Sequence, residues 1–482
     1  MESANPAKSE RLPTGKIAAF ATAAMPVAAL GIPLTVFLPN YYASHIGLSL
    51  AAVSGAFALV RLIDIVFDPL VGITINSTHL PLGRFRPWML MGAPLLMIAA
   101  YAIFMAEPGI SKLYMVGWLL VLYAGFSLIT LGHSSWAAAL VPEYHQRSRI
   151  YGWMQAVGVL ATITVLALPP LLSTVWHKTA AQGVQAMGWF VIIVVPISLA
   201  LCMSVVGEPK QTEQRHTISF RDYWTMLART SLLRLLGSDL ALALGPAITA
   251  ALYIFFFTEV LGFTRNQTSL LLLIYIFAGL SGAPSWARVS RRLGKHQTVM
   301  LACVLYGFAQ ALVFVMPHGK MLTMVPGMFF AGFVVSAFTF LIRAMIADIG
   351  DEVRLEIGKD RTALLYGLVS STSKVGSTIS VPITFNIIAA FGFNPKEGAV
   401  NSGIALDALT ACYVIVPILT MFVGAFLLRG YKLDAKRHGE IRDALAERDG
   451  ALDGAGGVIE SLSGVGAVNA PGAAAIQLSP GE

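Results

Sequence analysis

Charged residues are scarce in this chain: Asp, Glu, Lys and Arg make up only 12% of its 482 residues. Soluble domains carry about 25% charged residues, so the chain has roughly half the charge expected of a water-exposed surface. Hydrophobic residues make up 56%, and the mean hydropathy is +0.71. A single soluble core stops growing at about 250–300 residues. We therefore infer that lipid, rather than water, surrounds most of the surface.

Cysteine is also scarce, and the three cysteines have neither the number nor the spacing of a disulfide framework or a zinc site. All of them lie in apolar segments: Cys202, Cys303 and Cys412. The sequence has no His/Glu cluster with metal-ligand spacing, no placed nucleophile elbow and no phosphate-binding glycine loop outside those segments. An integral-membrane enzyme is therefore a weak alternative. We expect no cofactor, and no metal other than a coupling ion.

Long apolar segments are what the chain has in abundance. A bilayer core needs about 20 apolar residues per helix, and segments of this kind occur as two groups of six. They are 17–42, 50–75, 88–106, 113–142, 148–170, 185–206, 233–259, 268–288, 298–316, 321–345, 363–391 and 404–428. The sequence therefore predicts an all-α membrane protein with twelve transmembrane helices in two six-helix bundles.

These segments divide the chain into five parts. We expect a cytoplasmic N-terminal segment (1–16), an N-terminal six-helix bundle (17–206), a central cytoplasmic loop (207–232), a C-terminal six-helix bundle (233–428) and a cytoplasmic tail (429–482). Most of the tail is rich in Gly and Ala, a composition that predicts disorder. Paired six-helix halves are typical of secondary transporters.

Basic residues gather in alternate connections between the apolar segments. They include Lys8, Arg11 and Lys16 before the first segment, GRFRPW (83–88) after the second and RVSRRLGK (288–295) after the eighth. The positive-inside rule therefore predicts a multi-pass protein of the cell inner membrane with both termini in the cytoplasm. This distribution accounts for the net charge of +7 without a nucleic-acid partner.

Three charged residues interrupt the second apolar segment, in RLIDIVFDPLVG. At a helix centre, Arg61, Asp64 and Asp68 each cost about 2.5–3.5 kcal/mol, and their spacing puts them on one helix face. Two carboxylates this close repel each other, so a proton, a cation such as sodium, or a basic side chain from another helix must join them. Lys374, deep in the eleventh segment and surrounded by hydroxyl residues, is such a side chain.

We therefore interpret the two aspartates as a cation-binding site, and Lys374 and Arg61 as coupling residues. The alternative is an inert ion-pair cluster that only holds helices together, and Arg61 alone could also extend to the membrane interface. Asp239 and Arg343 lie nearer the ends of their segments. For these two residues we favour a structural role.

Three stretches of sequence resemble one family of transporters. RLIDIVFDPLVGITINSTHLPLGRFRPW (61–88) is similar to the signature of the glycoside–pentoside–hexuronide:cation symporters, the melibiose-permease-like branch of the major facilitator superfamily. ALVPEYHQRSRIYGW (139–153) and AMIADIGDEVRLEIGKDRTALLYG (344–367) agree with that family, and the likeness extends to about residue 430. The resemblance implies the major facilitator fold, with alternating access around a central cavity.

The resemblance also implies roles for particular residues. Asp64 and Asp68 match the paired cation-site aspartates of the family, and Lys374 matches its lysine in the eleventh helix. Melibiose-type members also hold sugar hydroxyls with one aspartate in the first helix and another in the fourth. In this chain those positions fall on or near Ala28 and Ser134, so a galactoside should not be recognised in the same way.

The family likeness implies a cytoplasmic gate around the GRFRPW loop. In this interpretation Arg84 and Arg86 form gating contacts with acidic residues of other loops, such as Glu143 or Asp351.

Candidate substrate-binding residues lie together in the fourth segment: His133, Ser134 and Trp136. The indole can stack on a sugar face or an apolar tail, and the other two can donate hydrogen bonds. A packing histidine is the alternative interpretation of His133.

The favoured function is secondary active transport, in which sodium or proton symport drives a glycoside or related sugar by alternating access. The alternative is a cation-coupled symporter of a lysophospholipid or another amphiphilic non-sugar solute, because a related branch of the fold moves such molecules while keeping the aspartate pair and the lysine. We expect a monomer whose partners are a small-molecule substrate and membrane lipid. The only metal expected is a sodium ion at Asp64 and Asp68.

Overall fold

The computed structural model describes residues 13–78, 80–140, 144–208, 227, 229–317, 319–357 and 362–448. Helices account for nearly all of this part of the chain, as the apolar segments predict. Within the described residues they form twelve spans in two groups of six.

The first group of spans begins with a helix of changing pitch. Its parts are α1 (Thr14–Ala21), η1 (Thr22–Ala24), α2 (Met25–Ile32), η2 (Pro33–Phe37) and α3 (Leu38–Ser44). Pro26, Pro33 and Pro39 lie near these changes, because proline removes a backbone donor from the helix. The other five spans are α4 (Leu50–Ser77), α5 (Arg86–Phe104), α6 (Lys112–Leu140), α7 (Tyr144–Trp176) and α8 (Ala180–Val205).

The second group repeats this layout. Its spans are α10 (Thr230–Phe255) with η3 (Phe256–Val260), α11 (Arg265–Leu293), α12 (Lys295–Val315), α13 (Met321–Ile357), α14 (Thr362–Ala390), and α15 (Gly403–Thr410) with η4 (Ala411–Ile415) and α16 (Val416–Leu427). The tenth span continues to Ile357, past the predicted end at residue 345, which places Asp348 and Asp351 on α13.

Ten of the described spans are long and apolar enough to cross a membrane, and an eleventh is added if α11, bent by 46° before Pro284, counts as one. The remaining span, α14, is 29 residues long. It is less apolar because hydroxyl residues and Lys374 occupy its centre. Several of these polar residues face other helices, since α14 packs on both α4 and α10, whereas Ser370 and Ser371 are exposed.

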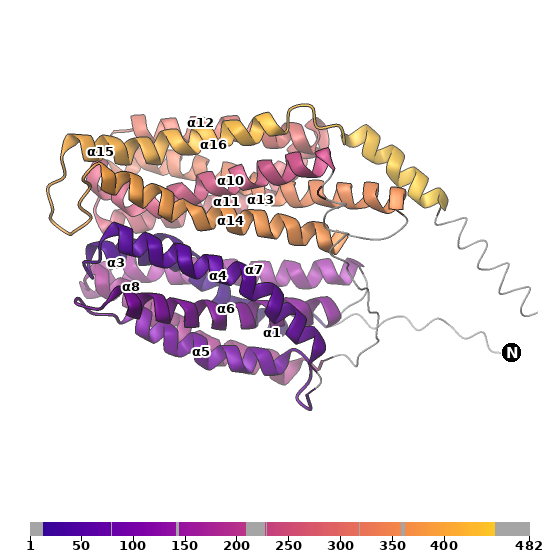
Figure 1. Ribbon diagram of the computed structural model, residues 1–482, viewed down its shortest axis with the longest axis horizontal. Coiled ribbons are helices and arrows are strands. Elements are labelled where there is room, and N and C mark those ends of the chain that lie inside the picture. Colours follow the sequence, from indigo (N-terminus) through magenta and orange to yellow (C-terminus); the bar gives the residue numbers. More distant parts are fainter. Residues whose placement is uncertain are drawn as a thin grey trace, which may run out of the picture.

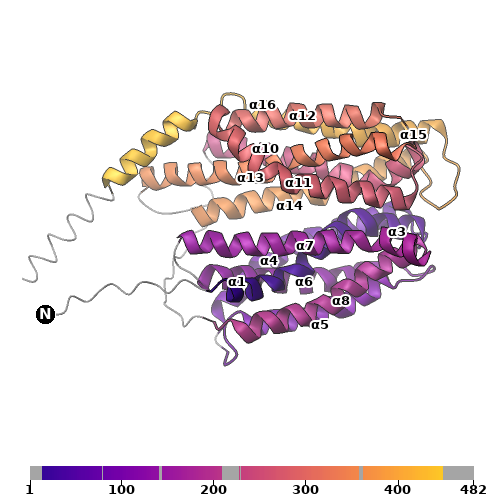
Figure 2. The ribbon, with the colours of Figure 1, turned by 180° about the vertical axis from the view of Figure 1, so that it is seen from behind.

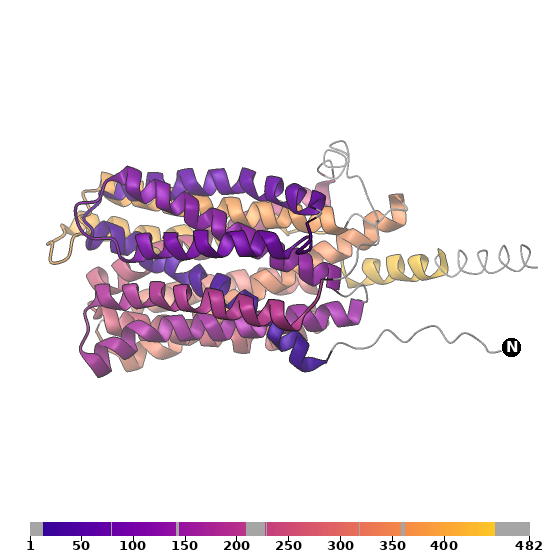
Figure 3. The same ribbon diagram turned by 90° about the horizontal axis from the view of Figure 1, so that it is seen from below.

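The two groups of spans form two halves that lie side by side (Figures 1 and 2). The first half is coloured indigo to magenta in Figure 1, and the second pink to yellow. Contacts between them run mainly along α4 with α14 and along α7 with α11. The beginning of α1 and a further helix at 435–448 lie at the same end of the molecule, which we call the terminal end (Figure 3).

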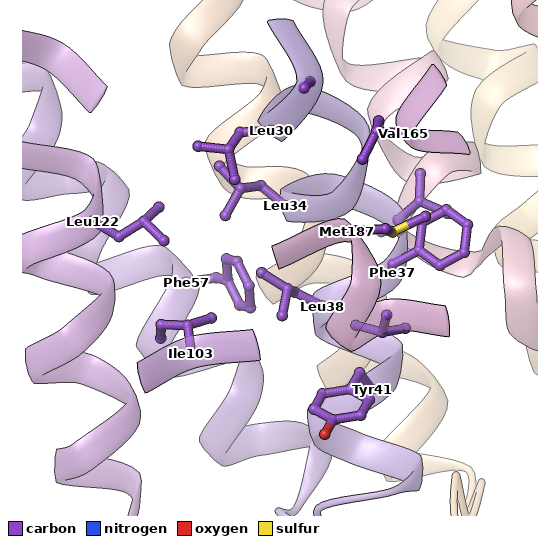
Figure 4. Close-up of a cluster of buried hydrophobic side chains, with 14 of the residues drawn as sticks. Leu30, Leu34, Phe37, Leu38, Tyr41, Phe57, Ile103, Leu122, Val165 and Met187 are labelled. Atoms are coloured by element: carbon purple, nitrogen blue, oxygen red, sulfur yellow. The ribbon is translucent and has the colours of Figure 1, made fainter. Parts of the chain in front are cut away.

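The core of the first half surrounds its first span (Figure 4). Leu34 and Leu38 point from this span towards Phe57 of α4, and all three are at most 3% exposed. Ile103 of α5 and Leu122 of α6 complete this side of the cluster. Close van der Waals contact among these side chains holds the first span at the centre of its bundle.

Small residues let neighbouring helices approach closely. A methyl group on Gly92 of α5 would lie 2.9 Å from the carbonyl oxygen of Gly125 on α6. Close backbone approach of this kind replaces the hydrophobic effect as a packing force between helices in lipid.

The predicted tail is partly helical. Residues 435–448 form a helix whose Ile441 and Leu445 are buried in the core of the second half, with Leu433 just before it. His438 Nε2 lies 2.9 Å from Asp351 Oδ2 on α13. The helix is therefore anchored to the terminal end of the second half. Residues 449–482, which include the Gly/Ala-rich stretch predicted to be disordered, lie outside the described residues.

Candidate functional site

Two carboxylates and an ammonium group meet where α4 packs on α14. Lys374 Nζ lies 3.4 Å from Asp64 Oδ2 and makes a closer ion pair with Asp68 Oδ2. The side chains of Lys374, Asp64 and Asp68 are 38%, 10% and 19% exposed, respectively. The four-residue spacing on α4 places the two carboxylates on the face that Lys374 approaches. This group, which we call the ionic cluster, joins the two halves.

Ser127 of α6 completes the ionic cluster. Its hydroxyl donates a hydrogen bond of 2.9 Å to Asp64 Oδ1. The second carboxylate oxygen of Asp68, Oδ1, is buried and accepts no hydrogen bond from the described residues. A buried carboxylate oxygen without a donor is costly, and a coupling ion or a proton would satisfy it.

Arg61 lies on the same face of α4 and makes a second connection between the halves. Its guanidinium donates a 2.9 Å hydrogen bond to Ser377 Oγ on α14. The same group lies 5.6 Å from the ring centre of Tyr123 on α6, a distance at which a cation is attracted to the ring face. Arg61 therefore neither extends to the membrane interface nor pairs with Asp64 or Asp68 in the described contacts.

The donor atoms of the ionic cluster suit a small hard cation. Carboxylate and hydroxyl oxygens are the ligands that such cations take in proteins, and Asp64, Asp68 and Ser127 supply them. Within the described residues, no group of three or more His, Cys, Asp or Glu side chains could hold a metal ion.

A cavity of about 660 Å³ lies between the halves, nearer the terminal end. Most of the cavity wall comes from the first span, α6 and α7 of the first half. From the second half, Arg343 of α13 lines the cavity. Ala28 and Ser134, at or near the positions where melibiose-type members carry aspartates, both line it. Within the described residues no carboxylate lines this cavity.

The three predicted substrate-binding residues have different surroundings. Ser134 lines the cavity, and its carbonyl accepts a 3.3 Å hydrogen bond from Tyr151 on α7. His133 also lines the cavity but is only 3% exposed, and its Nε2 lies 3.0 Å from the carbonyl oxygen of Phe20. Its main contacts are therefore those of a packing histidine.

The expectation for Trp136 does not agree with the structure. Its side chain is fully buried and lies outside the cavity wall, edge-on to Phe20 with ring centres 5.2 Å apart. The reason is helical geometry: each residue turns a helix by about 100°, so Trp136 lies roughly 200° around α6 from the cavity-lining Ser134.

Residues 19–435 match the family model described as MFS/sugar transport protein. This match covers most of the chain. The chain belongs to this family of membrane transporters. The resemblance to melibiose-permease-like symporters and the predicted all-α major facilitator fold are thereby confirmed.

Curated relatives of this transporter are similar along most of their length. The isoprimeverose transporter of Lactiplantibacillus pentosus is 24% identical, covering 83% of this chain and 85% of its own. The glucuronide carrier protein homolog of Escherichia coli is 23% identical, with 84% and 89% covered. The human sodium-dependent lysophosphatidylcholine symporter 1 is 24% identical, with 80% and 78% covered.

Solved structures share the fold of this transporter. The nucleoside transporter NupG has a TM-score of 0.62 at 12% identity and covers 87% of this chain and 100% of its own. A bacterial homolog of the human lysosomal transporter Spinster, in an inward-facing and unoccupied conformation, has a TM-score of 0.58 at 13% identity, with 90% and 97% covered.

The GRFRPW loop of the transporter is held by an acid that the sequence did not indicate. The Glu208 carboxylate accepts hydrogen bonds from the backbone N–H groups of Arg84 (2.6 Å), Phe85 (3.0 Å) and Arg86 (2.7 Å). Gly83 has a φ of +109°, and a methyl group there would lie 2.5 Å from the Glu208 carboxyl carbon. Glycine is therefore required at position 83. The hydrogen bonds to Glu208 join the loop after the second span to the end of the sixth span.

The predicted gating pairs have a different arrangement in the described residues. The Arg86 guanidinium donates to the carbonyl oxygens of Met203 (3.2 Å) and Val206 (2.5 Å) within its own half. Asp351 pairs with His438 of the tail helix. Glu143 lies outside the described residues, so a contact between it and Arg84 stays a prediction.

The end opposite the terminal end is closed by a polar network. Arg265, the first residue of α11, donates to Asn40 Oδ1 (2.7 Å) and Ser44 Oγ (3.2 Å) of α3. It also pairs with Glu397 at 3.2 Å. The first contacts join the two halves of the transporter, so Arg265 holds this end shut while the large cavity lies towards the other.

Proposed function

We propose that this transporter is a cation-coupled symporter of a glycoside or related sugar. The observation that carries the proposal is the ionic cluster, in which Lys374 of the second half pairs with both Asp64 and Asp68 of the first. Charges are retained inside membrane helices chiefly where they serve transport or proton relay. Here they lie between the two halves, whose relative movement is the transport step in alternating access.

The ion pairs suggest how a cation could control this movement. Sodium or a proton that binds Asp64 and Asp68 competes with Lys374 for the same carboxylate oxygens. Releasing Lys374 removes the ionic contact between α4 and α14, which lowers the free-energy cost of rearranging the halves once substrate is present. A ligand can shift a conformational equilibrium only by its difference in affinity for the two states, and this competition supplies such a difference.

The basic loops set the proposed orientation. The positive-inside rule places both termini in the cytoplasm of an inner-membrane protein. The large cavity then faces the cytoplasm, and the Arg265 network closes the outer side. The conformation is therefore inward-facing, ready to release substrate into the cell.

Ser134, Tyr151 and Gln155 offer hydrogen-bonding groups to a sugar in the large cavity. His133 is a further candidate if its ring turns away from Phe20. Support for the sugar class comes from relatives named as an isoprimeverose transporter and a glucuronide carrier homolog.

An amphiphile is the second candidate substrate. Val27, Ile32, Met154 and Val159 give the cavity wall an apolar side, and one relative is named as a sodium-dependent lysophosphatidylcholine symporter. Such a wall suits an acyl chain as well as the apolar face of a sugar.

The experiment that tests the function is uptake into proteoliposomes under an imposed sodium or proton gradient. The labelled panel contains mono- and disaccharides, hexuronides and lysophosphatidylcholine. We expect a sugar to accumulate with one gradient and not with the other. Accumulation of the lysolipid alone would select the second candidate, and accumulation that ignores both gradients would contradict symport.

A further inference from the structure

The large cavity contains a charge that the proposed symport cycle does not use. Among its lining residues in the described part of the chain, Arg343 is the one permanently charged side chain. It is exposed, and it reaches the cavity from α13 of the second half. The other lining residues that the structure describes belong to the first half.

The Arg343 guanidinium makes no hydrogen bond or ion pair with the described residues; only its backbone carbonyl is engaged, by Tyr366 at 3.1 Å. Asp239 of α10 is near enough for the Arg343 charge to act on it. Its Oδ2, however, accepts hydrogen bonds from Thr372 (2.6 Å) and Ser373 (2.8 Å) on α14. Arg343 is therefore not neutralised by a direct ion pair in this part of the chain.

We propose that the transported solute carries an anionic group, a carboxylate or a phosphate, which binds to Arg343. A guanidinium offers five N–H donors in a planar fork that matches both groups. A cavity with a cation and no carboxylate among its described lining residues disfavours cationic solutes and attracts anionic ones. Ser134 and Gln155 remain for the neutral, hydroxylated part of the solute. This inference rests on the proposed function, because it takes the cavity as the substrate site.

The position of Arg343 gives the anionic group a mechanical role. It lies on the second half, whereas Ser134 and Gln155 lie on α6 and α7 of the first. A solute that binds Arg343 through its anionic group and Ser134 through a hydroxyl would connect the halves across the cavity. Such a contact forms only when both parts of the solute are present, so it favours closure around the correct substrate.

Binding to the purified full-length protein tests the inference with matched probes. Each pair has the same sugar with and without the anionic group: 4-nitrophenyl β-D-glucuronide against 4-nitrophenyl β-D-glucoside for the carboxylate, and glucose 6-phosphate against glucose for the phosphate. We expect the wild type to bind one anionic probe at least tenfold more tightly than its neutral partner. Arg343→Gln should weaken that probe about tenfold to a hundredfold, the range for a lost charge-assisted contact.

The controls separate the charge at this position from charge in general. Arg291→Gln removes an exposed arginine near the end of α11 and should change neither probe. Arg343→Lys keeps the charge but loses the fork, so the anionic probe should weaken by severalfold while the neutral probe is unchanged. If Arg343→Gln does not fold, this second variant decides the question.

Two binding results would overturn the inference. In one, no anionic probe binds the wild type more tightly than its neutral partner. In the other, the preference is as strong in the Arg343 variants as in the wild type. Gradient-driven uptake of a neutral sugar alone would also overturn it, yet would leave symport intact. Arg343-dependent anion binding with uptake that ignores both gradients would instead contradict symport and leave this inference standing.

Discussion

At the scale of single residues, the ionic cluster depends on a serine that no sequence pattern indicated. Asp64, Asp68 and Lys374 were predictable because a charge in an apolar segment is conspicuous and needs a partner. Ser127 was not, because one hydroxyl among apolar residues carries no such signal: it can bond to its own helix. In the folded structure, the rotation of α6 about its axis turns Ser127 towards α4, where its hydroxyl donates to Asp64.

Ser127→Ala tests whether this hydroxyl takes part in cation binding. The variant removes a hydroxyl oxygen beside Asp64 that can be a ligand of the bound cation, so we expect roughly a tenfold rise in the cation concentration that half-saturates uptake. The maximal rate at saturating cation should be largely retained. Ser54→Ala is the control, because Ser54 is equally buried on α4 but bonds only to Ala51 of its own helix. Equal cation dependence in both variants would exclude Ser127 from the site.

Lys374→Ile tests the competition between lysine and cation. Without the ammonium group the two carboxylates have no partner in the cation-free state, and an uncompensated buried charge costs about 3–5 kcal/mol. We expect concentrative uptake to be lost while counterflow, in which the cation stays bound, persists. Lys374→Arg, which keeps the charge, should restore part of the uptake. If counterflow and concentrative uptake are both unchanged by Lys374→Ile, the lysine has a structural role.

At the scale of elements, the spans could be predicted more securely than their rotations. Hydropathy locates a helix because lipid demands about 20 apolar residues. It does not show which side of α6 faces the cavity, since lipid-facing and core-facing side chains are both apolar. This is why Trp136 was expected in the cavity and is buried behind it. The same limit concealed Glu208, since several acidic residues lie near the loops and only the fold selects one.

Arg265→Ala tests the network that closes the end opposite the terminal end. Removing it breaks two hydrogen bonds to α3 and the pair with Glu397, each worth about 1 kcal/mol or less at this exposure. We expect the other conformation to become several-fold more populated. Maleimide labelling of Ser173→Cys, beside this network on α7, should then accelerate severalfold. The native cysteines are buried and give a low background.

The control for this experiment is Lys320→Ala, which removes an exposed basic side chain just before α13. Its labelling rate should equal that of the parent. If Arg265→Ala also labels at the parental rate, Arg265 does not hold this end closed.

At the scale of the whole molecule, the contacts between the halves have different chemical characters. Near the terminal end a cavity separates them, at the opposite end Arg265 joins α11 to α3, and between α4 and α14 the ionic cluster joins them through charges. Of these two contacts, a cation can dissolve only the ionic cluster by direct competition. This makes the ionic cluster the point at which ion binding and the movement of the halves are linked.

The central claim is that a cation at Asp64 and Asp68 drives transport, and Asp68→Asn tests it most directly. The amide keeps the shape of the side chain but removes one of the two negative charges. With a substrate identified by the uptake panel, we expect the wild type to accumulate it in proteoliposomes under a sodium or proton gradient. The folded variant should not accumulate it. Wild-type accumulation by Asp68→Asn under the same gradient would contradict the cation site and the mechanism built on it.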